Sequence, residues 1–282
     1  MKDMSADTDM TTYLSGEKLY GDDFSIAQLK KWYEEEAEGY SSLVKETRRH
    51  YSYVYHELNK MHGFRHEKLP RNCEALGIGS AYCEEFLPIL SNLAHITALD
   101  PSEQFSISKL HDVPVSHVRP SIEGKMPFVD NQFDIITCFG VLHHIANVSF
   151  VLEECHRVLK PGGVMFCREP IVSMGDWRNP RRGATKNERG IPFGLFTEMV
   201  KRSGFEISRK TLFDFAPLGR LLSVVGLTTF ALKTSTILDY LLSWLFAFNK
   251  KYHRVGTLEK FGPASLYLVL HKNPLSAGTE NS

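Results

Sequence analysis

Residues capable of binding or chemistry follow four short apolar stretches of this chain. They are two glycines, an aspartate, two histidines and a glutamate: Gly77, Gly79, Asp100, His143, His144 and Glu169. Glycine lets a backbone approach a ligand closely, a carboxylate accepts hydrogen bonds from a diol, and histidine exchanges a proton near neutral pH. In an open parallel α/β sheet, ligands bind in a crevice at the carboxyl ends of the strands. We therefore expect these residues to line a single site.

The elements that would position these residues alternate between apolar strands and helices. Strands are expected at 72–77, 95–100, 115–118, 133–139, 163–168, 205–213 and 264–271. Apolar residues recur at helical spacing over 25–62 and 148–159, whereas residues 1–23 are polar and expected to fray. This order predicts an α/β fold with a mostly parallel sheet and helices on both faces.

The glycine pair follows the first strand and precedes a helical segment, where free backbone N–H groups can bind a ligand. A dinucleotide fingerprint would need a third glycine at position 82, which is Tyr82. A G-x-G-x-G turn would need it at position 81, which is Ala81, a smaller change. The G-x-G-x-G pattern usually has an acidic residue two positions before its first glycine. In this chain that position is Ala75, and Glu74 lies one step earlier. An ordinary glycine turn without a ligand is the alternative.

Asp100 ends the second strand, 21 residues after Gly79. Its carboxylate could accept two hydrogen bonds from a ribose diol. The Asp-Pro-Ser at 100–102 is also a good helix start, in which case Asp100 would cap that helix. The glycine turn upstream favours the ribose interpretation.

Three longer stretches carry a family resemblance: SIEGKMPFVDNQFD (121–134), FDIITCFGVLHHI (133–145) and LEECHRVLKPGGVMFCREP (152–170). Together with the glycine turn they resemble the class I S-adenosylmethionine-dependent methyltransferases of type 11. The whole chain is also similar to bacterial methyltransferases encoded with glycan-assembly enzymes. The resemblance implies S-adenosylmethionine as cofactor and a Rossmann-like, seven-stranded sheet. It also implies cofactor-binding residues near the strand ends: Glu74, Gly77, Gly79, Ser80, Asp100, Pro101, Ser121, Ile122, Glu123, Phe139 and Gly140.

Methyl transfer to an oxygen needs a group that accepts the proton. His143 and His144 lie on the loop at the reaction face and Glu169 ends the next strand, so all three are candidate bases. Helix capping or a bond to a loop carbonyl is the alternative for the histidines, and pairing with Arg168 or with the arginine-rich loop at 173–190 is the alternative for Glu169. Four N-terminal histidines lack further ligands at zinc spacing and predict no metal site: His50, His56, His62 and His66.

Two regions bear on the acceptor. The loop at 173–190 is rich in arginine, which suits a carboxylate or phosphate, and its Trp177 could stack on a sugar. A solvated loop with internal ion pairs is the alternative. The segment 215–248 holds two apolar stretches that are too short to span a bilayer. It predicts a helical hairpin that closes the site as a lid, or one that docks on a membrane through Trp244 and its aromatic neighbours.

Composition bounds the remaining possibilities. The 282 residues carry no net charge, which argues against general nucleic-acid binding. Five dispersed cysteines and the absence of a visible secretion signal predict a cytoplasmic protein, with membrane contact through the insertion left open. We expect a helical cap at 1–70, a cofactor-binding core at 71–213, an apolar insertion at 214–261, and a last strand and tail at 262–282.

These observations lead to one main function and three alternatives. The main one is methyl transfer to a hydroxyl or carboxylate of a small polar acceptor that contains a sugar. The second is methyl transfer to a lipophilic small molecule held by the insertion. A scaffold without catalysis is supported by Ala75 and Ala81 and opposed by Asp100 and the histidine pair. A nicotinamide-dependent reductase is disfavoured by Tyr82, and the oligomeric state is open.

Overall fold

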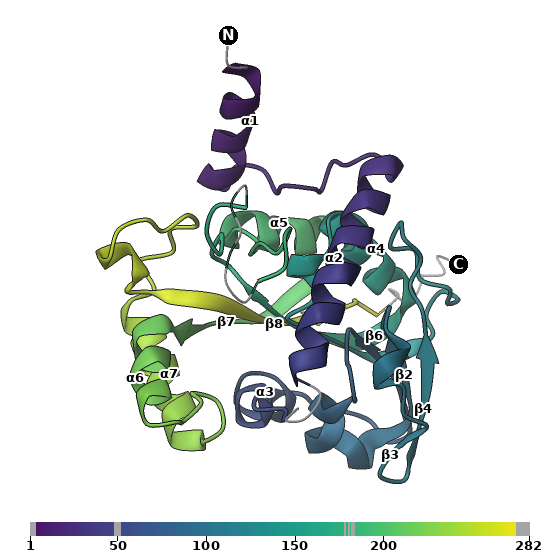
Figure 1. The fold of residues 1–282 in the computed structure, drawn as a ribbon. Coiled ribbons are helices and arrows are strands. Elements are labelled where there is room, and N and C mark those ends of the chain that lie inside the picture. The colour runs from purple at the N-terminus through teal and green to yellow at the C-terminus, as the bar shows by residue number, and fades with distance from the viewer. Residues whose placement is uncertain (1–3, 48–51, 178, 180, 182–183, 275–282) are drawn as a thin grey trace, which may run out of the picture.

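In the described part of the chain, eight strands form one sheet (Figure 1). The computed structural model describes residues 4–47, 52–177, 179, 181 and 184–274, with the backbone alone for 4–9 and 37–47. The strands are β1 (Cys73–Ile78), β2 (Leu93–Leu99), β3 (Lys109–Leu110), β4 (Val113–Val118), β5 (Phe133–Phe139), β6 (Leu159–Pro170), β7 (Glu206–Phe215) and β8 (Pro263–His271). Their order across the sheet is β3-β4-β2-β1-β5-β6-β8-β7.

The strands from β4 to β6 in this order run parallel, and β8 lies antiparallel between β6 and β7. The predicted α/β class with a mostly parallel sheet is confirmed. The predicted count of seven strands is one too low, because the two-residue β3 pairs antiparallel with β4. A strand this short has no apolar alternation of its own from which it could be predicted.

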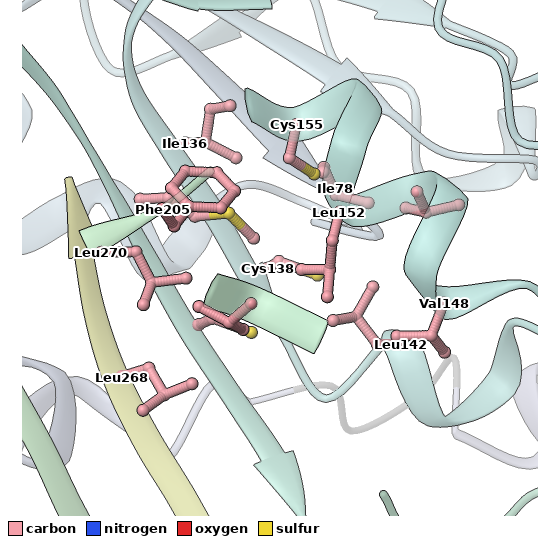
Figure 2. Packing of buried hydrophobic residues seen from close by; sticks show 14 of the residues in the cluster. Ile78, Ile136, Cys138, Leu142, Val148, Leu152, Cys155, Phe205, Leu268 and Leu270 are labelled. Atoms are coloured by element: carbon pink, nitrogen blue, oxygen red, sulfur yellow. The ribbon is translucent and has the colours of Figure 1, made fainter. Parts of the chain in front are cut away.

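Helices cover both faces of the sheet (Figure 1). On one face lie α4 (Val148–Val158) and α5 (Phe193–Arg202), and on the other lie α3 (His56–His62) and the 3-10 helix η2 (Glu84–Asn92). The α4 helix turns its apolar side chains toward the sheet at intervals of three and four residues. Figure 2 shows Leu152 and Cys155 of α4 among Ile136 and Cys138 of β5. This packing fixes the loop between β5 and α4.

The N-terminal region adds α1 (Met4–Ser15) and α2 (Ile26–Thr47). The expectation that residues 1–23 fray is wrong for the described residues 4–23, because α1 forms and Tyr13 and Leu19 are buried. The α2 helix lies against the turn that follows β5, where the indole Nε1 of Trp32 donates to the carbonyl of His144 over 2.7 Å. Its polar residues are thereby brought to the carboxyl ends of the strands.

The segment between β7 and β8 forms α6 (Ala216–Val224), α7 (Lys233–Leu245) and the 3-10 helix η5 (Leu258–Lys260). The α7 helix contacts β7 and α3, and Figure 1 shows α6 and α7 together at the β7 end of the sheet. Among the described helices, none has both the length and the apolar character required to cross a membrane. Three further 3-10 helices lie in loops: η1 (Phe64–His66), η3 (Glu103–Phe105) and η4 (Leu142–His144).

Candidate cofactor and active site

A cavity of about 680 Å³ opens at the carboxyl ends of β1, β2, β4 and β5, beneath α2. Its size falls within the roughly 300–1,000 Å³ that is usual for small-molecule sites. Seven of the predicted site residues line it: Gly79, Asp100, Pro101, Ser121, Ile122, Gly140 and His144. The structure therefore brings the chemistry-bearing ends of four strands to one place.

The glycine turn forms one wall of the cavity. Gly79 has φ +61°, and a Cβ added there would lie 2.5 Å from Cγ2 of Val141. Gly77 does not line the cavity; a Cβ there would lie 2.0 Å from the Oγ of Ser80, which is itself buried. Ala81, at the third position of the G-x-G-x-G pattern, also has a positive φ, of +42°. The tight backbone thus exposes Gly79 to the cavity, while Gly77 and Ser80 shape the turn behind it.

Asp100 faces this turn from the end of β2 and is only 2% exposed. Burial raises the pKa of its carboxyl, against which the backbone N–H groups of Ser102 and Ala81 act. Its Oδ1 accepts the N–H of Ser102 over 2.8 Å. An ionised carboxylate offers about four acceptor positions. The N-cap of the following 3-10 helix, η3, is Ser102 rather than Asp100, so Asp100 does not cap that helix as the alternative expected. Acceptor capacity for a diol remains on its carboxylate beside the bond from Ser102.

The other cofactor-binding predictions are distributed differently. Glu74 lies near the start of β1, with its carboxylate 3.6 Å from Nδ1 of His95, so it is at the far end of the strand from the cavity. Glu123 is exposed and contributes its backbone carbonyl to Asn147 rather than a side chain to the cavity. The ring of Phe139 packs against Phe64 on the other face of the sheet. The structure does not bring these three side chains to the site.

Glu169 holds the turn that carries the histidines. Its Oε1 accepts the backbone N–H groups of Val141 and Leu142, each over 2.9 Å. Its Oε2 accepts the N–H of His143 and lies 2.7 Å from Nδ1 of the same residue. The carboxylate is 1% exposed and does not line the cavity. Glu169 therefore positions the turn, and burial lowers the pKa of the neighbouring His143.

His144 is the member of the pair that lines the cavity, and its partner is Glu36 of α2. The Nδ1 of His144 lies 3.0 Å from Oε2 of Glu36. Glu36 also accepts the hydroxyl of Thr185 over 2.6 Å and the N–H of Asn187 over 2.9 Å. Burial alone would raise the pKa of Glu36, but these hydrogen bonds outweigh it and the pKa is lowered. Glu36 is thus an ionised carboxylate that orients His144.

Glu36 was not predicted as a site residue. It precedes His144 by 108 positions, and only its place in a helix with Trp32 one turn earlier hinted that it faces inward. No sequence motif joins it to the histidine pair.

The described arginines of the loop at 173–190 that donate hydrogen bonds are engaged with backbone carbonyls of the protein. Arg189 donates to the carbonyls of Tyr20, His143, Ile145 and Ala146, and Arg181 likewise donates only to loop carbonyls in the bonds observed. Trp177 is buried and stacks on the ring of Tyr20 at 5.7 Å, so it is not open to a sugar. Arg178, Arg182 and His50 lie outside the described residues.

Potential metal ligands meet beside the cavity in the described part of the chain. One atom each of His143, His144 and Glu188 lies within 4.8 Å of the others, and a second such group is Cys138, Cys167 and Glu169. Both histidines already direct Nδ1 toward a carboxylate. The absence of a metal site stays a prediction.

Comparisons with known proteins agree with this architecture. Residues 76–167 match a family model described as a methyltransferase domain. A ubiquinone biosynthesis O-methyltransferase of Marinobacter nauticus is 36% identical over 80 residues, which are 26% of this chain and 34% of that enzyme. A methyltransferase solved in complex with the Haloferax volcanii Trm112 activator has a TM-score of 0.51 at 14% identity, over 86% of this chain and 97% of that chain. An S-adenosylmethionine-dependent methyltransferase structure from Listeria monocytogenes has a TM-score of 0.50 at 14% identity, over 77% and 97%.

These comparisons cover different parts of the chain and support different conclusions. The match spans about a third of the length of the curated relatives, and the solved structures support the fold alone. The family match runs from β1 into β6 and so includes the glycine turn, Asp100 and the histidine pair. Residues 76–167 of this chain form a methyltransferase domain.

Proposed function

We propose that this protein transfers a methyl group from S-adenosylmethionine to an oxygen atom of a small acceptor bound in the cavity. The observation that carries the proposal is the convergence of Gly79, Asp100 and the His144–Glu36 pair on one cavity. The first two fit a nucleoside, and the pair fits a proton acceptor for a hydroxyl.

The cofactor would supply a methyl group already activated on a cationic sulfur. Backbone at Gly79 and Gly140, neither of which carries a Cβ, permits close approach along one wall. Asp100 would accept hydrogen bonds from the ribose hydroxyls. Ser121 and Ile122 border the same cavity from the loop after β4 and would flank the base. The cavity thus has the groups that the two ends of a nucleoside require.

Catalysis by the chain would rest on alignment and on one proton transfer. Holding two reactants in line can contribute roughly 7–11 kcal/mol in favourable cases. The carboxylate of Glu36 accepts from Nδ1 of His144, which leaves Nε2 as the basic atom of the ring. General-base assistance contributes typically about 10²–10⁴-fold. His144 is therefore the proposed base, with Glu36 and Glu169 as positioning residues.

The acceptor that the cavity supports best is a lipophilic small molecule with a hydroxyl. Apolar side chains form much of the wall: Leu29, Trp32, Met126, Val141, Ile145 and Val151. The sugar-containing acceptor expected from the sequence rested on Trp177 and the loop arginines, and the described members of that set are engaged within the protein. The curated relatives are enzymes of ubiquinone biosynthesis, which supports the lipophilic class.

The test uses isotope-labelled S-adenosylmethionine with cell extract separated into aqueous and organic fractions. We expect label in an organic-soluble product, and a loss of about 10²-fold or more in rate for His144→Ala with cofactor binding kept. His111→Ala, at an exposed histidine of the β3–β4 turn, is the matched control. Label in the aqueous fraction alone would refute the acceptor class. Full activity of His144→Ala would refute the assigned base.

A further inference from the structure

The α7 helix is amphipathic in the reverse sense of a water-soluble surface helix. It buries Thr236, Asp239 and Ser243, which are polar and at most 1% exposed. It exposes apolar side chains instead: Ile237, Leu238, Leu241, Trp244 and Leu245. A surface helix normally turns its apolar stripe to the core and its polar face to water. The outward face of α7 is therefore fitted to a medium other than water.

Specific hydrogen bonds fix this orientation. Both carboxylate oxygens of Asp239 accept backbone N–H groups at the end of β7, from Asp214 over 2.9 Å and from Phe215 over 2.8 Å. Rotating the helix to bury its leucines would leave these two N–H groups and the carboxylate without partners, which is costly. The exposure of the apolar face is thus a consequence of how α7 is anchored to the sheet.

The apolar face continues beyond α7. Large apolar side chains of α6 and of the flanking loops are also exposed: Leu221, Val224, Val225, Leu227, Leu232 and Phe248. We call these residues together with the exposed face of α7 the insertion surface. Figure 1 shows α6 and α7 together at the β7 end of the sheet, away from β4. None of the described residues lining the cavity comes from 214–261, so the hairpin does not act as a wall of the site.

The charged residues around the insertion surface are mostly basic, which indicates an anionic partner. Between residues 216 and 258 the only acidic residue is Asp239, which is 0% exposed. Exposed basic residues in the same segment include Arg220, Lys233 and Lys250. Basic side chains near an anionic bilayer are attracted to its surface. Two copies of the chain pairing through this surface would instead bring like charges together.

We propose that the insertion surface docks on the face of an anionic lipid bilayer, with Trp244, Leu241 and Phe248 in the interfacial layer and the basic residues at the headgroups. Aromatic and aliphatic side chains flanked by lysine and arginine are typical of segments that lie in the plane of a membrane. The proposal does not depend on methyl transfer. If the proposed lipophilic acceptor is correct, docking would place the enzyme where such molecules dissolve.

The chain carries its own probe for the test. Of its three tryptophans, Trp32 and Trp177 are buried, whereas Trp244 is 68% exposed. We expect vesicles of phosphatidylcholine with phosphatidylglycerol to shift tryptophan emission to the blue and to carry the full-length protein in flotation. The shift should disappear in Trp244→Phe.

Variants separate the apolar and the electrostatic contributions. Leu241→Ser with Trp244→Ser should lower vesicle partitioning about tenfold or more, because two apolar side chains no longer enter the interface. Lys233→Glu with Lys250→Glu should weaken binding to anionic vesicles, and added salt should weaken binding of the unaltered protein. Val129→Ser, an exposed apolar position outside the insertion, is the matched control. The thermal transition of each variant checks that it is folded.

Two results would overturn the proposal. One is the absence of binding to anionic vesicles at low salt, with Trp244 emission unchanged. The other is a concentration-dependent dimer, seen by analytical ultracentrifugation, that Leu241→Ser with Trp244→Ser abolishes, since the surface would then be an interface between copies of the chain.

Discussion

Glu85 is a buried carboxyl beside the glycine turn, and its removal should stabilise the protein in a pH-dependent way. It lies in η2, is 4% exposed, and accepts the hydroxyl of Thr137 over 3.4 Å. Burial raises its pKa to about 7. An unfolded glutamate titrates near pH ~4.3. The folded protein therefore favours the protonated form of Glu85.

The sign of the effect follows from this order of pKa values. The folded state holds a proton that the unfolded state has lost, so Glu85 reduces stability progressively as the pH rises from about 4.5 to 7, and the reduction is constant above that range. The linkage relation gives a reduction of roughly 1 kcal/mol at pH 5 and roughly 3.5 kcal/mol at pH 8. In Glu85→Gln this pH dependence is absent. The difference in unfolding free energy between variant and wild type should therefore rise by about 2.5 kcal/mol from pH 5 to pH 8.

Urea denaturation of both proteins at the two pH values measures this difference. If the N–H groups of the new amide lack partners, the unfolding free energy of Glu85→Gln is lowered by the same amount at both pH values. This constant shift cancels when the two pH values are compared. Glu153→Gln, at an exposed position of α4, is the control and should show no such rise. An unfolding free energy difference for Glu85→Gln that is the same at pH 5 and pH 8 would refute the reasoning.

Three further substitutions test how the site is held. Gly79→Ala should weaken binding of S-adenosylhomocysteine in calorimetry, because φ +61° costs alanine about 1–2 kcal/mol and its Cβ would meet Val141. Adding Val141→Ala should restore part of the affinity. Unchanged affinity in the single variant would contradict the account. Glu169→Gln should lower the unfolding free energy by about 2 kcal/mol, since a charged acceptor of three backbone N–H groups becomes neutral; an unaltered thermal transition would speak against that role. Arg189→Met should lower the unfolding free energy by about 3 kcal/mol or more, because it leaves buried carbonyls without donors. If urea denaturation shows the variant to be as stable as the wild type, the carbonyls have found other partners.

The sheet could be predicted because each of its principal strands is an apolar run bounded by turn residues. Asp100 and Gly79 could be placed together for a related reason: each directly follows a strand, and parallel strands bring their ends to one edge. The two-residue β3 and the packing of residues 10–23 could not be predicted, since neither carries a periodic pattern long enough to read. The site roles given to these residues stay predictions.

Long-range partners account for what the sequence left open. Glu36 reaches His144 only because α2 folds back over the strand ends, and nothing near either residue in the chain indicates it. The arginines at 181 and 189 look free in the sequence because it does not show which carbonyls lie within reach. The apolar character of α7 suggested a lid or a membrane contact, and the sequence does not show that the anchoring of Asp239 turns the apolar face outward.

Calorimetric titration of the purified protein with S-adenosylhomocysteine, alongside Asp100→Ala, tests the central claim most directly. We predict saturable binding by the wild-type protein and a loss of about 100-fold or more in affinity for Asp100→Ala, because two hydrogen bonds to a charged group are removed. The thermal transition of the variant checks that it is folded. Equal affinity of the two proteins, or binding of NAD in place of the nucleoside thioether, would contradict the assignment of this cavity to S-adenosylmethionine.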